Sequence, residues 1–220
     1  MIADLADFIR SNKFKTVGIV GNAASGKTTL SRKIEPEFYS VDFRFIGDSD
    51  FRKRLLSSKA HNLDDYLDAC NMYNWWDWDL VETDINNFIV SGKISLSGYY
   101  DRDTGHTIKE PLVVSPSCLV VDGAILGPLS VLDKLEALFF VYTEPSERFN
   151  RLVSKDIGRR SFGEIVARFL VTEYSENLYY ASTLKYYDML FVDKDYNLIA
   201  KPKDWVVEHQ FLPLDLGKLP

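Results

Sequence analysis

Short apolar runs alternate with amphipathic stretches along most of the chain. The apolar runs are rich in Val, Ile, Leu and Phe, a composition typical of strands buried on both faces of a parallel sheet. They predict strands at 16–20, 42–46, 94–96, 118–121, 138–142 and 189–192. The amphipathic stretches predict helices at 27–35, 63–70, 77–91, 144–154 and 162–178. Because alternating strands and helices build right-handed β-α-β units, the pattern predicts an α/β fold with a largely parallel sheet.

The connection between the first predicted strand and the first predicted helix carries the most informative motif. Residues 21–29 read Gly-Asn-Ala-Ala-Ser-Gly-Lys-Thr-Thr, which completes the pattern G-x-x-x-x-G-K-[ST] of a phosphate-binding loop. Glycines let successive backbone N–H groups face one anion, and the start of the following helix adds partial positive charge. The residues predicted to bind nucleotide phosphates are Gly21, Asn22, Ala23, Ala24, Ser25, Gly26, Lys27, Thr28 and Thr29.

Two side chains of this loop have distinct expected roles. Lys27 would neutralise the β- and γ-phosphates of ATP, which makes it a catalytic residue, and Thr28 would ligate Mg²⁺ through its hydroxyl. ATP and Mg²⁺ are therefore the expected cofactors. The loop in this setting predicts a P-loop NTPase fold, in which a three-layer arrangement places helices on both faces of a largely parallel five-stranded sheet.

Length and charge narrow the functional class. The chain of 220 residues suits one domain, and its net charge of −6 argues against a nucleic-acid partner, which usually meets a basic patch. No apolar run approaches the roughly 20 residues of a membrane span, and the first nine residues predict a short helix rather than a signal peptide. Cys70 and Cys118 lack metal-binding spacing and are expected to be free thiols. We expect a cytoplasmic protein with a small-molecule substrate, with homo-oligomer formation left open.

Further segments follow the loop in a recognisable order. Residues 46–51 read Ile-Gly-Asp-Ser-Asp-Phe, residues 99–102 read Tyr-Tyr-Asp-Arg and residues 120–123 read Val-Val-Asp-Gly. The stretch 147–160 is rich in Arg and Lys. In this order the segments resemble the uridine kinase and phosphoribulokinase-like group of P-loop small-molecule kinases, and the resemblance extends over roughly residues 14–193.

The resemblance implies a catalytic base in the segment after the second strand, where the family carries an aspartate. Asp48 and Asp50 would share one face of an extended segment, opposite Ser49. We favour Asp48, which would stand immediately past the strand end, where α/β sheets place ligand groups. Asp50 is the alternative, and Asp48 could instead cap a following helix, since aspartate is a preferred N-cap.

The resemblance also assigns roles further along the chain. Asp122, where the family has a glutamate, would serve Mg²⁺ or the substrate, and Arg159 and Arg160 would clamp phosphates as part of a lid, with a solvated helix end as the alternative. The residues expected to contact the substrate are Tyr100, Asp101, His106 and Lys155. The aromatic cluster at 73–78 could stack on a ring or simply join the core.

Together these features predict an ATP-dependent kinase that transfers the γ-phosphate to a hydroxyl of a small metabolite, a nucleoside or a related riboside. The alternatives are a kinase of a nucleoside monophosphate, a sugar or a pantothenate-like acid, and a nucleotide-binding regulator without turnover. The expected organisation is a single P-loop kinase domain over 1–220, with an acceptor-binding segment at about 51–103, a lid at about 151–163 and a C-terminal tail at about 200–220.

Overall fold

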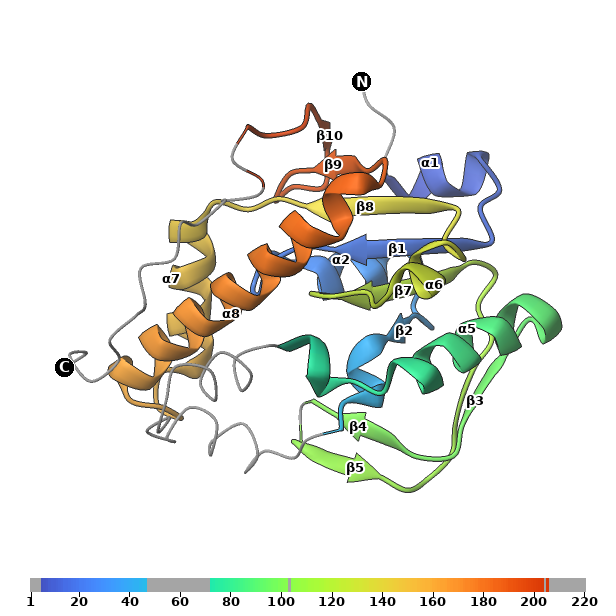
Figure 1. Ribbon diagram of the computed structural model, residues 1–220, viewed down its shortest axis with the longest axis horizontal. Helices are drawn as coiled ribbons and strands as arrows, with labels where there is room; N and C mark the ends of the chain where they lie inside the picture. The colour runs from blue at the N-terminus through green and yellow to red at the C-terminus, as the bar shows by residue number, and fades with distance from the viewer. Residues whose placement is uncertain (1–4, 47–71, 103, 204, 206–220) are drawn as a thin grey trace.

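A mostly parallel sheet forms the centre of the molecule (Figure 1). The computed structural model describes residues 5–46, 72–102, 104–203 and 205. Within these ranges the sheet has the strand order β10-β9-β8-β1-β7-β2, and only β10 runs antiparallel to its neighbour. Its strands are β1 Thr16–Val20, β2 Tyr39–Ser40, β7 Leu119–Gly123, β8 Ala137–Val141, β9 Leu190–Val192 and β10 Leu198–Ile199. The predicted P-loop NTPase fold is confirmed, with five parallel strands and an additional antiparallel edge strand.

Helices cover both faces of this sheet, as predicted. They are α1 Leu5–Ser11, α2 Lys27–Ile34, α5 Trp78–Ser91, α6 Leu129–Leu132, α7 Pro145–Asp156 and α8 Phe162–Ser182, with short 3-10 turns η1 Val41–Arg44, η2 Met72–Trp75 and η3 Leu184–Tyr186. The predicted helix at 63–70 lies outside the described residues. Within the described ranges, none of the helices combines the length and apolar character that a membrane span requires.

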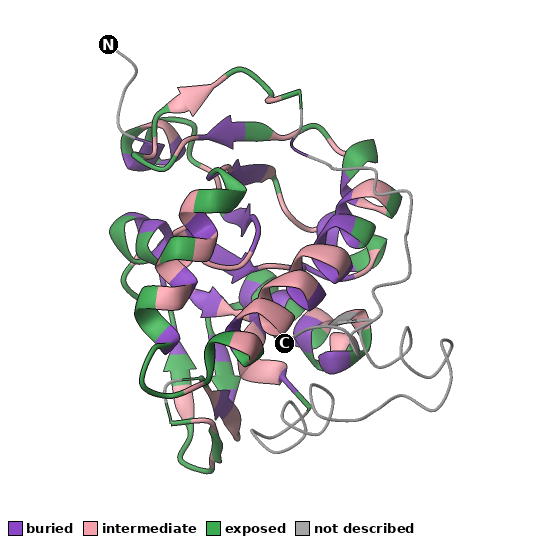
Figure 2. Ribbon diagram, turned by 90° about the vertical axis from the view of Figure 1, so that its left-hand side faces the viewer, coloured by how far each residue is buried: buried purple, intermediate pink, exposed green. Residues whose placement is uncertain are grey.

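Side chains of the central strands alternate between two hydrophobic cores. Along β8, Leu138 and Phe140 join the core formed with α5, α6 and α8, whereas Phe139 and Val141 join the core formed with α1 and α2. Successive side chains of a strand point to opposite faces, so a strand covered on both faces is apolar throughout. Figure 2 shows the resulting buried strands between partly exposed helices. The continuous apolar runs of the sequence therefore mark the middle layer.

The longest helix, α8, begins where its sequence signals a start. The hydroxyl of Ser161 accepts the backbone N–H of Glu164 at 3.3 Å, and the Glu164 carboxylate accepts the backbone N–H of Ser161 at 2.8 Å. This reciprocal capping box satisfies two amides that a helix start would otherwise leave without partners. It fixes the first turn of α8 directly after the connection from α7.

The predicted strand at 42–46 is wrong. The strand β2 ends at Ser40, whose hydroxyl accepts the backbone N–H of Asp42 at 3.3 Å, and the chain continues as the 3-10 turn η1. Arg44 is drawn to the buried carboxylate of Asp84 on α5 through two hydrogen bonds of 2.6 and 2.8 Å. These contacts with a distant helix override the local alternation of apolar and polar residues, which resembles a strand.

Two small antiparallel sheets extend beyond the central one. Strand β3 Ile94–Leu96 matches its predicted range, but it pairs with β6 Leu112–Val114 rather than with the central sheet. Strand β4 Tyr99–Asp101 pairs with β5 His106–Ile108. The hairpin of β4 and β5 contacts η1, and this contact brings the end of β4 close to the carboxyl edge of the central sheet.

Candidate nucleotide and phosphoryl-transfer site

The phosphate-binding loop joins the carboxyl end of β1 to the start of α2, and its shape depends on two glycines. Gly26 has a φ of 103°, in the left-handed region that favours glycine. A Cβ atom at Gly21 would lie 2.5 Å from the carbonyl oxygen of Val141, much closer than a carbon atom can approach. Glycine at these positions therefore permits the sharp passage from strand to helix beside β8.

Lys27, the lysine of the motif, folds back over the loop. Its Nζ donates to the carbonyl oxygen of Asn22 at 3.1 Å, and the side chain is buried. Burial lowers the pKa of Lys27, while the carboxylates of Asp122 and Glu176 act in the opposite direction. The ammonium group thus lies at the loop, in the place from which the lysine of this motif reaches β- and γ-phosphates.

Thr28 and Asp122 form an oxygen pair next to this lysine. Asp122 lies at the carboxyl end of β7, and its Oδ2 accepts a hydrogen bond from the Thr28 hydroxyl at 2.8 Å. The other carboxylate oxygen, Oδ1, is buried and has no hydrogen-bond partner among the described residues. Burial raises the pKa of Asp122, which Lys27 and Thr28 counteract. A hydroxyl with an unsatisfied carboxylate oxygen suits Mg²⁺, which typically uses one or two carboxylates together with phosphates and water.

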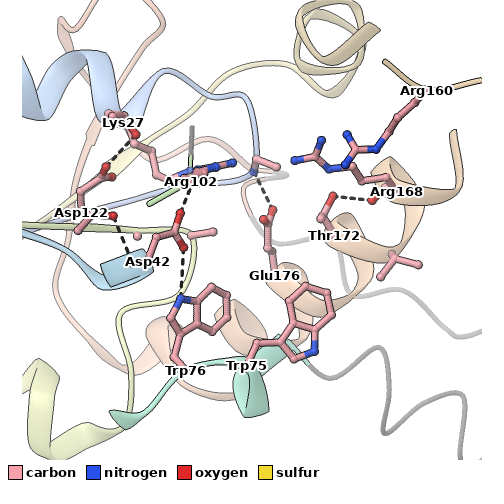
Figure 3. A pocket seen from close by; sticks show the side chains of 16 residues that line it. Lys27, Asp42, Trp75, Trp76, Arg102, Asp122, Arg160, Arg168, Thr172 and Glu176 are labelled. Atoms are coloured by element: carbon pink, nitrogen blue, oxygen red, sulfur yellow. Dashed lines mark hydrogen bonds and ion pairs between the residues drawn. The ribbon is translucent and has the colours of Figure 1, made fainter. Parts of the chain in front are cut away.

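Asp42 is the carboxylate that sequence reasoning missed. It lies in η1, two residues beyond β2, and shares with Lys27, Thr28 and Asp122 a cavity of about 90 Å³ (Figure 3). Its Oδ1 accepts the indole N–H of Trp76 at 3.2 Å, and its Oδ2 lies 3.1 Å from Nη1 of Arg102. The carboxyl ends of β1, β7 and β2 meet at one edge, so residues just past them converge.

The position of Asp42 bears on the prediction that Asp48 or Asp50 is the catalytic base. Asp48 and Asp50 lie outside the described residues, and their proposed role stays a prediction. Asp48 was favoured because it would follow the second strand immediately, but that strand ends at Ser40, so this premise is wrong. A correct strand boundary would have directed attention to Asp42.

Three guanidinium groups reach the same cavity from separate elements. Arg102 comes from the end of the β4 segment, Arg160 from the turn after α7 and Arg168 from α8. The Asp156 carboxylate binds both Arg160, at 3.1 Å, and Arg168. Burial lowers the pKa of Arg168, Asp156 opposes the change, and Arg102 and Arg160 reinforce it. Of the two arginines predicted for the lid, Arg160 lines this cavity, whereas Arg159 is exposed and outside the lining.

A second cleft opens on the outer side of the phosphate-binding loop. Its basic lining residues are Lys27, Arg102, Arg151, Lys155, Arg168 and Lys194. Arg151 donates to the loop carbonyl oxygens of Ala24 and Ser25 at 3.3 and 3.2 Å, and so ties α7 to the loop. Lys155, predicted to contact the substrate, lines this cleft rather than the cavity that holds Asp42.

Glu176 of α8 is a further residue that the sequence did not single out. Its Oε2 accepts the backbone N–H of Ala23, in the middle of the phosphate-binding loop, at 2.9 Å. The side chain is 1% exposed, and Oε1 has no hydrogen-bond partner among the described residues. Burial raises the pKa of Glu176 to about 7, against the effect of Lys27.

The predicted substrate residues of the 99–106 stretch lie apart from the cavity lining. Tyr100 is a core residue, 4% exposed, whose ring lies 4.8 Å from that of Phe45. Asp101 and His106 face each other across the hairpin of β4 and β5, and neither lines the cavity. From this stretch it is Arg102 that enters the cavity, so the hairpin reaches the site through a neighbouring residue.

Aromatic side chains form the remaining wall. Trp75 and Trp76 line the cavity, although both are largely buried and pack with Phe45. These two indoles of the 73–78 cluster belong to the core and also border the cavity, and stacking of the cluster on a ligand ring stays a prediction. The two indoles give the cavity an apolar face that lies beside Asp42 and Glu176 (Figure 3).

The fold and the loop together define a P-loop protein with the sheet architecture of P-loop kinases. The chain is 15% identical to a putative fructose transport system kinase from Silicibacter sp. TM1040, with a TM-score of 0.59 over 81% of this chain and 94% of that one. It is 16% identical to a possible uridine kinase from Bacillus stearothermophilus, with a TM-score of 0.55 over 86% and 97%. At these identities the likeness concerns the fold.

Curated sequences narrow the class. The chain is 26% identical over 195 residues to a uridine kinase of Leuconostoc citreum, covering 84% of this chain and 90% of the relative. It is 23% identical over 191 residues to a uridine kinase of Brevibacillus brevis, covering 84% and 87%. No family model matches the chain. The relatives confirm the resemblance to the uridine kinase and phosphoribulokinase-like group of P-loop kinases.

Proposed function

We propose that the protein is an ATP-dependent phosphotransferase whose acceptor is a hydroxyl of a small metabolite, a nucleoside or related riboside. The observation that carries this proposal is the meeting of Lys27, the Thr28–Asp122 pair and the Asp42 carboxylate in one cavity. Phosphoryl transfer asks mainly for positioning and for neutralisation of charge on the transferred group. A phosphate-binding loop that shares a cavity with an oriented carboxylate can supply both.

Thr28 and Asp122 are the residues that would hold Mg²⁺. They fit because one hydroxyl and one buried, unsatisfied carboxylate oxygen already lie together beside the loop. When bound with nucleotide, the ion would neutralise phosphate charge and fix the phosphate geometry. Lys27 is placed to stabilise the β- and γ-phosphates from the same side.

Asp42 is the proposed general base. Trp76 and Arg102 hold one oxygen each of its carboxylate, so the group is oriented before any acceptor binds. An acceptor hydroxyl placed between Asp42 and the loop could donate its proton to the carboxylate as the oxygen attacks phosphorus. Because the Arg102 side chain is 46% exposed, an approaching hydroxyl could replace its contact with Asp42.

Arg160 and Arg168 are proposed to close the site. Both share the Asp156 carboxylate on the connection between α7 and α8, and both line the cavity. Guanidinium groups bind phosphate oxygens well, and a closed lid excludes water, which competes with the acceptor. This connection therefore belongs to the proposed transfer site.

A phosphorylated acceptor is the second candidate. Arg102, Arg160 and Arg168 converge on the cavity, and together they could also bind a phosphate or carboxylate on the acceptor. A nucleoside monophosphate or a sugar phosphate would use them in this way. The two candidates differ in the acceptor's charge, so an acceptor panel separates them.

The test is a phosphotransfer assay with purified protein, ATP and Mg²⁺ against neutral nucleosides and ribosides, sugars, nucleoside monophosphates and sugar phosphates. We expect ADP and a phosphorylated product with a neutral riboside. Lys27→Ala is the control and should lower turnover by about 10²-fold or more while circular dichroism stays native. Equal turnover in wild type and Lys27→Ala would reject the proposal. Nucleotide binding without transfer to any acceptor would favour a regulator.

A further inference from the structure

One buried carboxyl group, from α8, contacts the phosphate-binding loop but has no role in the proposed transfer reaction. Glu176 extends from α8 to the loop, where its Oε2 accepts the Ala23 N–H at 2.9 Å (Figure 3). The side chain is 1% exposed, and within the described residues its Oε1 has no hydrogen-bond partner. Both Ala23 and Glu176 line the cavity that contains Lys27.

This placement conflicts with phosphate binding if Glu176 is ionised. Backbone N–H groups of such a loop are the donors that surround nucleotide phosphates. Here one of them is already bound to a carboxylate, and an ionised carboxylate would also repel the polyphosphate in a site of low dielectric. A neutral carboxyl group does not repel the phosphates and accepts the N–H less strongly, and it can itself donate an O–H hydrogen bond.

We propose that Glu176 is a proton-dependent residue of the nucleotide site, an inference that rests on the proposed binding of nucleotide at this loop. The ionised carboxylate holds the Ala23 N–H and opposes the phosphates. The neutral carboxyl group releases that N–H and donates its own O–H to a phosphate oxygen. Binding of nucleotide therefore takes up protons at Glu176, a fraction of a proton near neutral pH and close to one at higher pH.

The charged groups around Glu176 leave both forms accessible near neutral pH. Lys27 and Arg148 favour its ionised form, Glu173 opposes it, and Arg102 and Tyr180 also interact with it. Burial outweighs the cations and raises the pKa of Glu176 to about 7. A change of solution pH within the ordinary range is thus sufficient to switch this contact.

The first experiment measures the dissociation constant of a non-hydrolysable ATP analogue with excess Mg²⁺, by titration calorimetry, between about pH 6 and about pH 8. We expect wild-type affinity to fall about tenfold over this interval, as one deprotonation near pH 7 requires. Glu176→Gln stays neutral and keeps an N–H donor, so it should lose this dependence and bind more tightly than wild type at the higher pH. The exposed Glu110→Gln is the matched control and should follow wild type.

The comparison between variants separates the titration of Glu176 from the titration of the nucleotide's own phosphates. Terminal phosphates titrate near pH 6, and that contribution is common to all three proteins. If wild type and Glu176→Gln have the same pH profile, or if Glu176→Gln binds more weakly at the higher pH, the inference is overturned while nucleotide binding stands. If none of the proteins binds nucleotide at either pH, the proposed function fails as well.

A second measurement needs no substitution. Magnetic resonance of carbon-labelled glutamate carboxyl groups follows the titration of Glu176 in wild-type protein with and without the analogue. By linkage, a ligand that prefers the neutral carboxyl group must raise its pKa. We expect the titration to move upward by about one pH unit or more on binding. No movement, or movement to lower pH, would contradict the proposal.

Discussion

At the scale of single residues, the site contains buried ionisable groups, and opposite charges next to each group stabilise its charged form. Burial is the largest influence on the pKa of Lys27, Asp122 and Glu176. In each case a neighbouring opposite charge reduces the shift. Perturbed groups of this kind gather at functional sites, because a site that will receive a charged ligand must hold partly uncompensated charge beforehand.

Asp42→Asn tests the proposed base directly. The amide keeps the shape and the contact with Trp76 but cannot accept the acceptor's proton, so turnover should fall by about 10² to 10⁴-fold. ATP affinity should stay close to that of wild type. Steady-state kinetics at saturating ATP and acceptor, with nucleotide binding measured separately, checks both expectations.

Asp48→Asn and Asp50→Asn are the comparison variants for this experiment, since the sequence alone pointed to those positions. We expect each to retain turnover within about tenfold of wild type. A full loss at Asp48 or Asp50, together with an active Asp42→Asn, would return the base to the segment after residue 46 and leave Asp42 as a positioning residue for Arg102.

At the scale of elements, the connection between α7 and α8 brings two cavity-lining arginines onto one carboxylate. Asp156 ends α7 and joins Arg160 to Arg168 across the turn, and its side chain is almost fully buried. The capping box at Ser161 fixes the start of α8 just beyond. Because both arginines share the Asp156 carboxylate, a phosphate that bound them would compete with the same carboxylate.

Arg160→Ala should raise the fraction of ATP lost to water relative to phosphate transferred to the acceptor. Removing a cavity-lining guanidinium weakens closure over the phosphates and admits solvent. Arg159→Ala is the matched control, because the adjacent Arg159 is exposed and should leave the ratio unchanged. Parallel assays of ADP and phosphorylated product give this ratio, and equal ratios in the two variants would remove Arg160 from the lid.

Ser161→Ala tests whether the capping box holds α8 in place. Loss of the hydroxyl leaves a backbone N–H of the first turn without its acceptor and should lower the free energy of unfolding by about 1 kcal/mol. Ser161→Thr keeps the hydroxyl and should lose much less. Urea denaturation of the three proteins measures the difference, and a stability of Ser161→Ala equal to that of wild type would contradict the capping role.

At the scale of the whole molecule, α8 links function to stability. It contributes Tyr179 and Tyr180 to the larger core, and from the same helix it sends Glu176 into the phosphate-binding loop. The helix can therefore not change its packing without displacing a residue of the site. Burial of the Glu176 carboxyl group lowers the free energy of unfolding of the whole protein when the group is ionised, so this effect varies with pH.

The free energy of unfolding should depend on pH through Glu176. Its folded pKa of about 7 lies above the ordinary value of 4.5, so its contribution is fully present below about pH 4.5 and is lost as the pH rises through about 7. Glu176→Gln should therefore be more stable than wild type by roughly 3 kcal/mol at about pH 8, and the difference should shrink toward about pH 5. Chemical denaturation at both pH values checks the sign, and a difference independent of pH would contradict it.

The sequence by itself determined the features that depend on neighbouring residues. The phosphate-binding loop is a contiguous motif, and its glycines, Lys27 and Thr28 lie where the pattern predicts. Strands buried on both faces and long amphipathic helices were also predictable, because their periodicity is local. The order of the segments predicted the resemblance to a group of P-loop kinases, and similar solved structures share the fold.

Only the tertiary structure decided which distant residues share the cavity. Arg44, four residues beyond β2, donates a hydrogen bond to Asp84 of α5. This long-range contact holds the turn that contains Asp42 at the site. Glu176 reads in the sequence as one polar residue of a long helix, and its partner lies 153 positions earlier. Such pairings arise from packing of the completed fold, since the energy that fixes them comes from burial and contacts between elements rather than from local propensity.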